Sequence, residues 1–186
     1  MKTIHLIYIF IILLLAMPAS AQELELTNGV YEKKEVVEVS GAPILTLYER
    51  AIEALSDWVG PDGRSSIGID YSEKETGTVI YKGKFYLGFK NIFLGSGADR
   101  FTNFTLKVKC KDERAQVTVT VQSFICKFTN GVTTDYSLSQ LVDAVKKAKG
   151  KKRERGVAMV EEIKESVDIL IDAIKQRLSA SSDDDF

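Results

Sequence analysis

Apolar residues occupy every second position over two stretches of the chain, and this alternation predicts β-strands. The first stretch is residues 30–39, which a Ser-Gly-Ala-Pro sequence ends. The second is residues 67–128, where the alternating apolar positions of four more strands are Ile67, Ile69 and Tyr71; Val79, Tyr81, Phe85, Leu87 and Phe89; Phe104, Leu106, Val108 and Cys110; Val117, Val119 and Val121. After Ser123 the bulky positions shift by one residue, which predicts a β-bulge or burial on both faces.

Apolar residues three and four positions apart predict helices on either side of the four later strands. The first helix begins at Ile44 and ends before the Gly-Pro-Asp-Gly sequence at 60–63. The second helical region is residues 137–178, which Ser137 and Gln140 open as a capping box. One unbroken helix from 138 to 178 would be ~61 Å long, about twice the diameter of a small domain. We therefore expect a break at Gly150 or Gly156.

The element order is strand, helix, four strands and helix. One face of the strands is apolar and the helices are amphipathic, so the helices pack on one side of the sheet. The sequence thus predicts an α+β fold, a curved antiparallel five-stranded sheet with helices on one face. A loop joins the third and fourth strands at Gly95-Ser96-Gly97, which lacks the Gly-Lys-Ser/Thr ending of a phosphate-binding loop.

The first 21 residues have the pattern of a secretory signal peptide. Lys2 precedes an apolar run over residues 4–17, and Ala-Ser-Ala at 19–21 predicts cleavage between Ala21 and Gln22. The alternative is an uncleaved anchor, but about 14 apolar residues rise only ~21 Å against a hydrocarbon core of ~30 Å. No cysteine lies near the cleavage point to carry a lipid anchor. We expect a periplasmic or extracellular protein with one domain over residues 22–178 and an acidic disordered tail at 179–186.

Removing the leader also removes His5, the only histidine of the chain. A chain without histidine has no Ser-His-Asp triad, Cys-His pair, histidine base or His-ligated zinc site. The enzyme class left open is a hydrolase with paired carboxylates, and nothing in the sequence marks two of the 26 acidic residues as convergent. We expect a non-enzymatic protein with no metal and no cofactor.

Two cysteines, Cys110 and Cys126, raise the question of a disulfide in a secreted chain. If a hairpin turn lies at residues 112–114, the two cysteines are offset by about ten residues, or ~33 Å along the strands. A disulfide needs Cα atoms within about 7 Å. The spacing therefore predicts two unpaired thiols.

Four segments of the chain carry a family resemblance: YEKKEVVEVSG at residues 31–41, LYERA at 47–51 with Trp58, GTVI at 77–80 with Lys82-Gly83, and FTLKVKCKD at 104–112. Together they resemble a bacterial secreted family, the domain of unknown function 4468. The resemblance covers roughly residues 30–128. It implies a TATA-binding-protein-like fold and an envelope location, with no catalytic motif. Arg114-Ala115 departs from the family, in which an aromatic residue commonly follows the hairpin turn.

The polar face of the predicted sheet is the main candidate for a binding site. Its candidate ligand-binding residues are Lys82, Lys84, Tyr86, Lys107, Lys109, Thr118 and Thr120. Lysine and threonine are equally typical of an ordinary solvated face, because lysine opposes edge-to-edge aggregation. The leading hypothesis is a binding domain for an envelope glycan or another macromolecule. The alternatives are a carrier of a small apolar ligand and, third, a carboxylate hydrolase.

Seven basic residues fall within residues 146–155, between Lys146 and Arg155. A basic run can bind nucleic acid or anionic lipid, but the isoelectric point is near 6.0 and no aromatic residue is interleaved for base stacking. A TATA-binding-protein-like fold does not by itself imply DNA binding. We expect no nucleic-acid partner and no stable membrane anchor, and interpret the segment as a solvated junction between helices.

Overall fold

The structure is a computed structural model that describes residues 25–56, 63–93 and 96–180. Its elements in chain order are β1 (Tyr31–Glu38), α2 (Ile44–Ser56), β2 (Ser66–Glu73), β3 (Thr78–Phe93), β4 (Ser96–Lys111), β5 (Arg114–Phe128), β6 (Thr133–Ser137), α3 (Leu138–Lys147) and α4 (Lys151–Ser179). The signal peptide with its Ala21–Gln22 cleavage point, the end of the acidic tail and the Gly-Pro-Asp at 60–62 lie outside the described residues. Within the described part, no helix is both long and apolar enough to cross a membrane.

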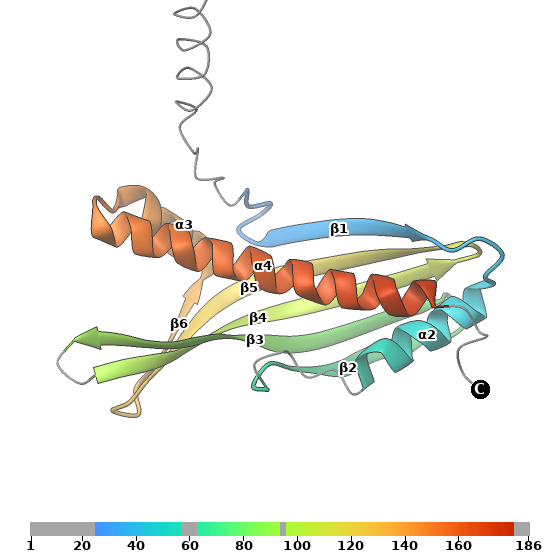
Figure 1. The fold of residues 1–186 in the computed structure, drawn as a ribbon, viewed down its shortest axis with the longest axis horizontal. Coiled ribbons are helices and arrows are strands. Elements are labelled where there is room, and N and C mark those ends of the chain that lie inside the picture. Colours follow the sequence, from blue (N-terminus) through green and yellow to red (C-terminus); the bar gives the residue numbers. More distant parts are fainter. Residues whose placement is uncertain (1–24, 57–62, 94–95, 181–186) are drawn as a thin grey trace, which may run out of the picture.

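All strands pair antiparallel in one curved sheet with the order β1-β5-β4-β3-β2 (Figure 1). The sheet has six strands rather than the predicted five, because β6 also pairs with β5. The α+β class is therefore confirmed and the strand count was wrong. β5 is 15 residues long and β1 covers only its first half. The short β6 pairs with residues 123–127 and so protects a backbone edge that would otherwise be open.

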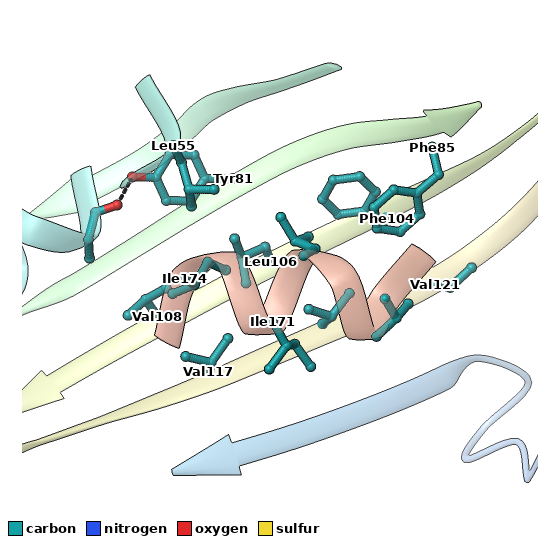
Figure 2. Close-up of a cluster of buried hydrophobic side chains, with 14 of the residues drawn as sticks. Leu55, Tyr81, Phe85, Phe104, Leu106, Val108, Val117, Val121, Ile171 and Ile174 are labelled. Carbon is teal, nitrogen blue, oxygen red and sulfur yellow. Dashed lines mark hydrogen bonds between the residues drawn. The ribbon is translucent and has the colours of Figure 1, made fainter. Parts of the chain in front are cut away.

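Three helices cover one face of the sheet and enclose a single core (Figure 1). Alternate residues of β3, β4 and β5 face the helices, as the period of two predicts. Figure 2 shows Ile171 and Ile174 of α4 lying over Leu106, Val108 and Val117 of the sheet. Each of these side chains is fully buried and contributes ~1.5–3 kcal/mol of hydrophobic free energy. None of the helices in the described residues lies over the opposite face of the sheet.

The β4–β5 turn fixes the start of α2. Glu113 adopts a φ of 63°, and its backbone N–H donates to the carbonyl of Ala42 at 2.8 Å. A side-chain oxygen of Asp112 accepts from the N–H of Ile44 at 2.9 Å, which satisfies a free donor at the helix N-terminus. In the resulting hairpin, Lys111 pairs with Arg114 and Cys110 with Ala115, which establishes the register where the chain departs from the family that it resembles.

Two local predictions around the β3–β4 hairpin were wrong. Phe89 was expected in the core, but the register shifts between Tyr86 and Phe89, Gly88 has a φ of 80°, and Phe89 is 49% exposed. The Phe89 ring instead covers Gly97, where a Cβ would lie 2.0 Å from its Cζ atom. Ser96 and Gly97, expected in a loop, are the first residues of β4 because the hairpin continues further than the apolar alternation. Gly95 lies outside the described residues.

Two other local predictions are confirmed. The bulge in β5 lies where the bulky positions shift, since Asn103 pairs with Ser123 and Phe104 with Val121. The helical region breaks at Gly150, which has a φ of 54° and precedes α4. Gly156 is instead buried inside α4, where it lets Val145 of α3 approach closely.

The two cysteines are unpaired and lie far apart in the sheet. Cys126 pairs across the strands with Arg100, and Cys110 lies ten residues further along β4. At about 3.3 Å per residue this separation is ~33 Å. The prediction of two free thiols therefore agrees with the register of the sheet.

Candidate binding sites

The candidate residues from the sequence lie together on the face of the sheet that is left open by α2, α3 and α4, the helices of the described part of the chain. Lys82, Lys84 and Tyr86 come from β3, Lys107 and Lys109 from β4, and Thr118 and Thr120 from β5. Each alternates with fully or nearly fully buried residues whose side chains point toward the helices. We call this surface the open face.

Cross-strand rows bring the open face into one continuous surface. One row runs from Tyr71 through Ile80, Lys107 and Thr118 to Lys34, and so crosses all five strands of the main path. Adjacent strands lie about 4.8 Å apart, so the row spans roughly 19 Å. The surface therefore presents an exposed aromatic ring, ammonium groups and hydroxyl groups within a short distance of one another.

Positive charge is in excess at the centre of the open face. Lys82 forms an ion pair with Asp70 at 3.0 Å. Lys84, Lys107 and Lys109 make no ion pair within the part of the chain that the structure describes. Like charges on neighbouring positions of a sheet repel one another, and an anion bound between them relieves this repulsion.

Tyr86 lies at the rim of the open face, where the protein itself uses its hydroxyl group. The hydroxyl donates to Asp99 at 2.9 Å, and Arg64 binds the same carboxylate through two nitrogens at 2.8 and 3.0 Å. The guanidinium of Arg64 also stacks 4.0 Å from the centre of the Tyr86 ring. Hydrogen bonds from Arg64 and Tyr86 lower the pKa of Asp99. Tyr86 is therefore a fixed part of the surface, with its ring held by Arg64.

A second candidate site lies on the helix side of the sheet, at the corner where α3 meets α4. It is a cavity of about 530 Å³ between these helices and the ends of β3, β4 and β5. Lys152 and Arg155, from the basic segment at 146–155, line it. This segment spans the end of α3, the turn at Gly150 and the first turn of α4, as expected of a junction between helices.

Sequence reasoning missed two cations of this cavity, Lys90 and Arg100, which come from β3 and β4. The sequence held one signal for Arg100. It lies four residues before the buried Phe104 on the same strand, so the alternation places both side chains on the core face. Among the described residues, no three His, Cys, Asp or Glu side chains are grouped as metal ligands. The geometry thus places two candidate sites on opposite sides of one sheet.

Comparison with known proteins supports the fold. The family described as "Domain of unknown function (DUF4468) with TBP-like fold" matches residues 34–124. A DUF4468 family protein from Bacteroides ovatus has a similar structure, with a TM-score of 0.58 and 16% identity over 88% of this chain and 93% of that one. A TBP-like protein from Parabacteroides distasonis also has a TM-score of 0.58, with 12% identity over 86% of this chain and 100% of that one.

No match to the sequence was found among curated proteins. At these identities the solved structures establish the fold alone. The sequence resemblance is nevertheless confirmed, because residues 34–124 match the model of the DUF4468 family, and the fold is TBP-like.

Proposed function

We propose that this chain is a non-enzymatic binding protein of the bacterial envelope, and that its open face docks an anionic glycan. The observation that carries the proposal is a group of three lysines, Lys84, Lys107 and Lys109, which have no carboxylate partner among the described residues and lie on a sheet face that none of the described helices covers. Sulfate or carboxylate groups of a glycan would accept hydrogen bonds from these ammonium groups.

The neighbours of the lysines suit a sugar better than a protein partner. Thr118 and Thr120 are half-buried beside the lysines and place hydroxyl groups at fixed positions. Tyr71 is 46% exposed and offers a flat apolar ring against which a sugar ring can stack. A protein interface would instead need a larger desolvated apolar centre than these polar rows provide.

Two observations support the envelope location. The first 21 residues have the pattern of a cleavable signal peptide without a lipid-accepting cysteine. Two of the similar solved structures come from bacteria, Bacteroides ovatus and Parabacteroides distasonis. We propose that the protein acts in the periplasm or outside the cell.

The test is a titration of the protein lacking residues 1–21 with dextran sulfate and with polygalacturonate, a sulfated and a carboxylated glycan. The test variant is K82Q/K84Q/K107Q/K109Q, which removes four charges from the open face. We expect at least one of the two glycans to bind, and the variant to weaken that binding about tenfold or more, since hydrogen bonds to charged groups contribute ~1.5–3 kcal/mol each.

A matched control removes the same number of positive charges, four, from the α3–α4 junction on the other side of the sheet. The variant K147Q/K149Q/K151Q/K152Q alters four lysines of the helix junction and leaves the open face intact. At an ionic strength that screens long-range charge, we expect this variant to change the affinity for the glycan less than about twofold. Binding of neither glycan, or equal effects of the two quadruple variants, would contradict the proposal.

A further inference from the structure

We infer that the cavity at the α3–α4 corner binds a single acyl chain that carries an anionic head group. The cavity holds about 530 Å³, within the usual range of about 300–1,000 Å³ for small-molecule sites. It lies on the opposite side of the sheet from the open face, so the inference does not depend on the glycan proposal.

The walls of the cavity are apolar and come from both layers of the fold. Phe124 and Cys126 of β5 form the sheet side, and Leu141, Val145 and Met159 of the two helices form the other. A hydrocarbon chain in contact with these walls leaves water, which is favourable by about 0.8 kcal/mol for each buried methylene group. The walls therefore suit the apolar part of a ligand.

The rim of the cavity is cationic. Lys90, Lys152 and Arg155 line it, are exposed, and form no ion pair in the described part of the chain. The one carboxylate in the lining is Glu162, which already forms an ion pair with Arg100 at 2.7 Å. An anionic head group at this rim would meet three cations that the protein itself does not neutralise.

Arg100 adds a directional donor inside the cavity. Its side chain is 11% exposed, and its two terminal nitrogens donate to Glu162 and to the carbonyl of Leu87. Its Nε atom is buried and has no hydrogen-bond partner within the described chain. The Arg100 side chain thus adds a fixed positive charge to the lining of the cavity, beside the carboxylate of Glu162.

Only an amphipathic anion uses all of these features together. A neutral hydrocarbon would fill the walls and leave the three cations of the rim without an anionic partner. A small hydrophilic anion would meet the cations and leave the apolar walls in water. The observations therefore favour a carboxylate or phosphate head on one acyl chain.

The test uses four probes in calorimetric titrations of the chain without residues 1–21. Dodecanoate and dodecyl phosphate carry the chain and the charge, dodecanol carries the chain alone, and inorganic phosphate carries the charge alone. We expect the two amphipathic anions to bind at least tenfold more tightly than either dodecanol or phosphate. The tighter of the two anions assigns the head group to a carboxylate or to a phosphate.

Chemical labelling of Cys126 measures ligand binding inside the site independently of calorimetry. It lines the cavity and is partly exposed, whereas Cys110 is fully buried in the core. Burial raises the pKa of the Cys126 thiol and Arg100 opposes this effect, so the labelling reaction is run near about pH 9, above the usual thiol pKa. We expect saturating dodecanoate to slow the labelling of Cys126 by maleimide at least fivefold.

Matched variants locate the site. K152Q/R155Q removes two rim charges, while K149Q/K151Q removes two charges from the same basic segment outside the lining. We expect the first pair to weaken dodecanoate binding about tenfold and the second less than twofold. Ala144 is exposed and lines the cavity, so A144F is expected to block it without disturbing the core.

Three results would overturn the inference. They are equal affinity for dodecanoate and dodecanol, labelling of Cys126 that dodecanoate does not slow, and equal weakening by the two double variants. The variant K107Q/K109Q on the open face is expected to bind dodecanoate as the unchanged protein does. Failure of glycan binding therefore leaves this inference standing, and failure of dodecanoate binding leaves the glycan proposal standing.

Discussion

At the scale of single residues, Gly83 shows how closely β3 packs on its neighbours. A Cβ atom at this position would lie 2.5 Å from Cζ of Phe104 and 2.5 Å from the carbonyl oxygen of Ser66. The Phe104 ring also stacks on Phe85 with centres 4.1 Å apart, as Figure 2 shows, so it cannot move away freely. A side chain at 83 therefore has no room between the core and β2.

We predict that Gly83→Ala lowers the free energy of unfolding by about 1–3 kcal/mol, because the added methyl group overpacks the core. Gly68→Ala is the matched control, since nothing lies within 4 Å of a Cβ atom there. We expect that control to stay within about 0.5 kcal/mol of the unchanged protein. Urea unfolding measures both, and equal stabilities of the two variants would show that the packing around Phe104 is looser than the structure indicates.

Glu35 on β1 links the sheet to α4. It forms ion pairs with Lys175 at 2.8 Å and with Lys33 at 3.3 Å, and Lys33 also binds Asp168 at 2.7 Å. The hydrogen bond from Lys175 is the main cause that lowers the pKa of Glu35. A carboxylate whose pKa is lowered by folding stabilises the folded state above its unfolded pKa, and this stabilisation is lost as the pH falls through the folded pKa.

We predict that Glu35→Gln destabilises the protein at pH 7 and that the difference from the unchanged protein begins to shrink near the unfolded pKa of glutamate, about pH 4, and is lost as the pH falls through the lower folded pKa. The measurement is the urea midpoint at neutral and acidic pH. Glu38→Gln, on the same strand and outside this network, serves as the control. A difference for Glu35→Gln that is the same at both pH values would mean that the ion pairs do not stabilise the fold.

At the scale of elements, the crossing of α3 and α4 is set by one glycine. A Cβ atom on Gly156 would lie 2.5 Å from a methyl group of Val145, so the two helices approach more closely than a side chain at 156 permits. The capping box at Ser137 and Gln140 fixes the start of α3, and Gly150 turns the chain back. This corner forms one wall of the cavity.

We predict that the effect of Gly156→Ala on stability depends on Val145. In the unchanged background the substitution destabilises by about 1–3 kcal/mol through overpacking. In a Val145→Ala background the methyl group has room, and the substitution stabilises by up to about 1 kcal/mol because alanine favours a helix more than glycine does. A double-mutant cycle by urea unfolding measures this, and additive effects of the two substitutions would contradict the close crossing.

The elements also show which parts of the fold could be predicted. The strands β3, β4 and β5 follow from alternation because one face is core and the other is solvent. β6 has the sequence TTDYS, in which no apolar alternation marks a strand, and it exists because β5 extends beyond β1. The helix break could be narrowed to Gly150 or Gly156, since both a turn and a close helix contact use glycine.

At the scale of the whole molecule, the two candidate sites differ in how far the sequence reveals them. Lys107 and Thr118 could be assigned to one surface because a period of two places them on the polar face of adjacent strands. The cavity could not be predicted, because its lining comes from five separate elements and depends on the angle at the α3–α4 corner. From the sequence, only Lys152 and Arg155 of its lining could be singled out, as members of a basic run whose position in the fold was not known.

We propose that the open face, whose lysines at 84, 107 and 109 have no carboxylate partner among the described residues, is the surface that binds an anionic glycan. The most direct test is an NMR titration of the isotope-labelled protein with a sulfated dextran oligosaccharide, following the backbone amide shifts. We predict that the largest shift changes fall on Lys82, Lys84, Lys107, Lys109 and Thr118. Changes centred on residues 146–155, or no changes on the open face, would contradict the account.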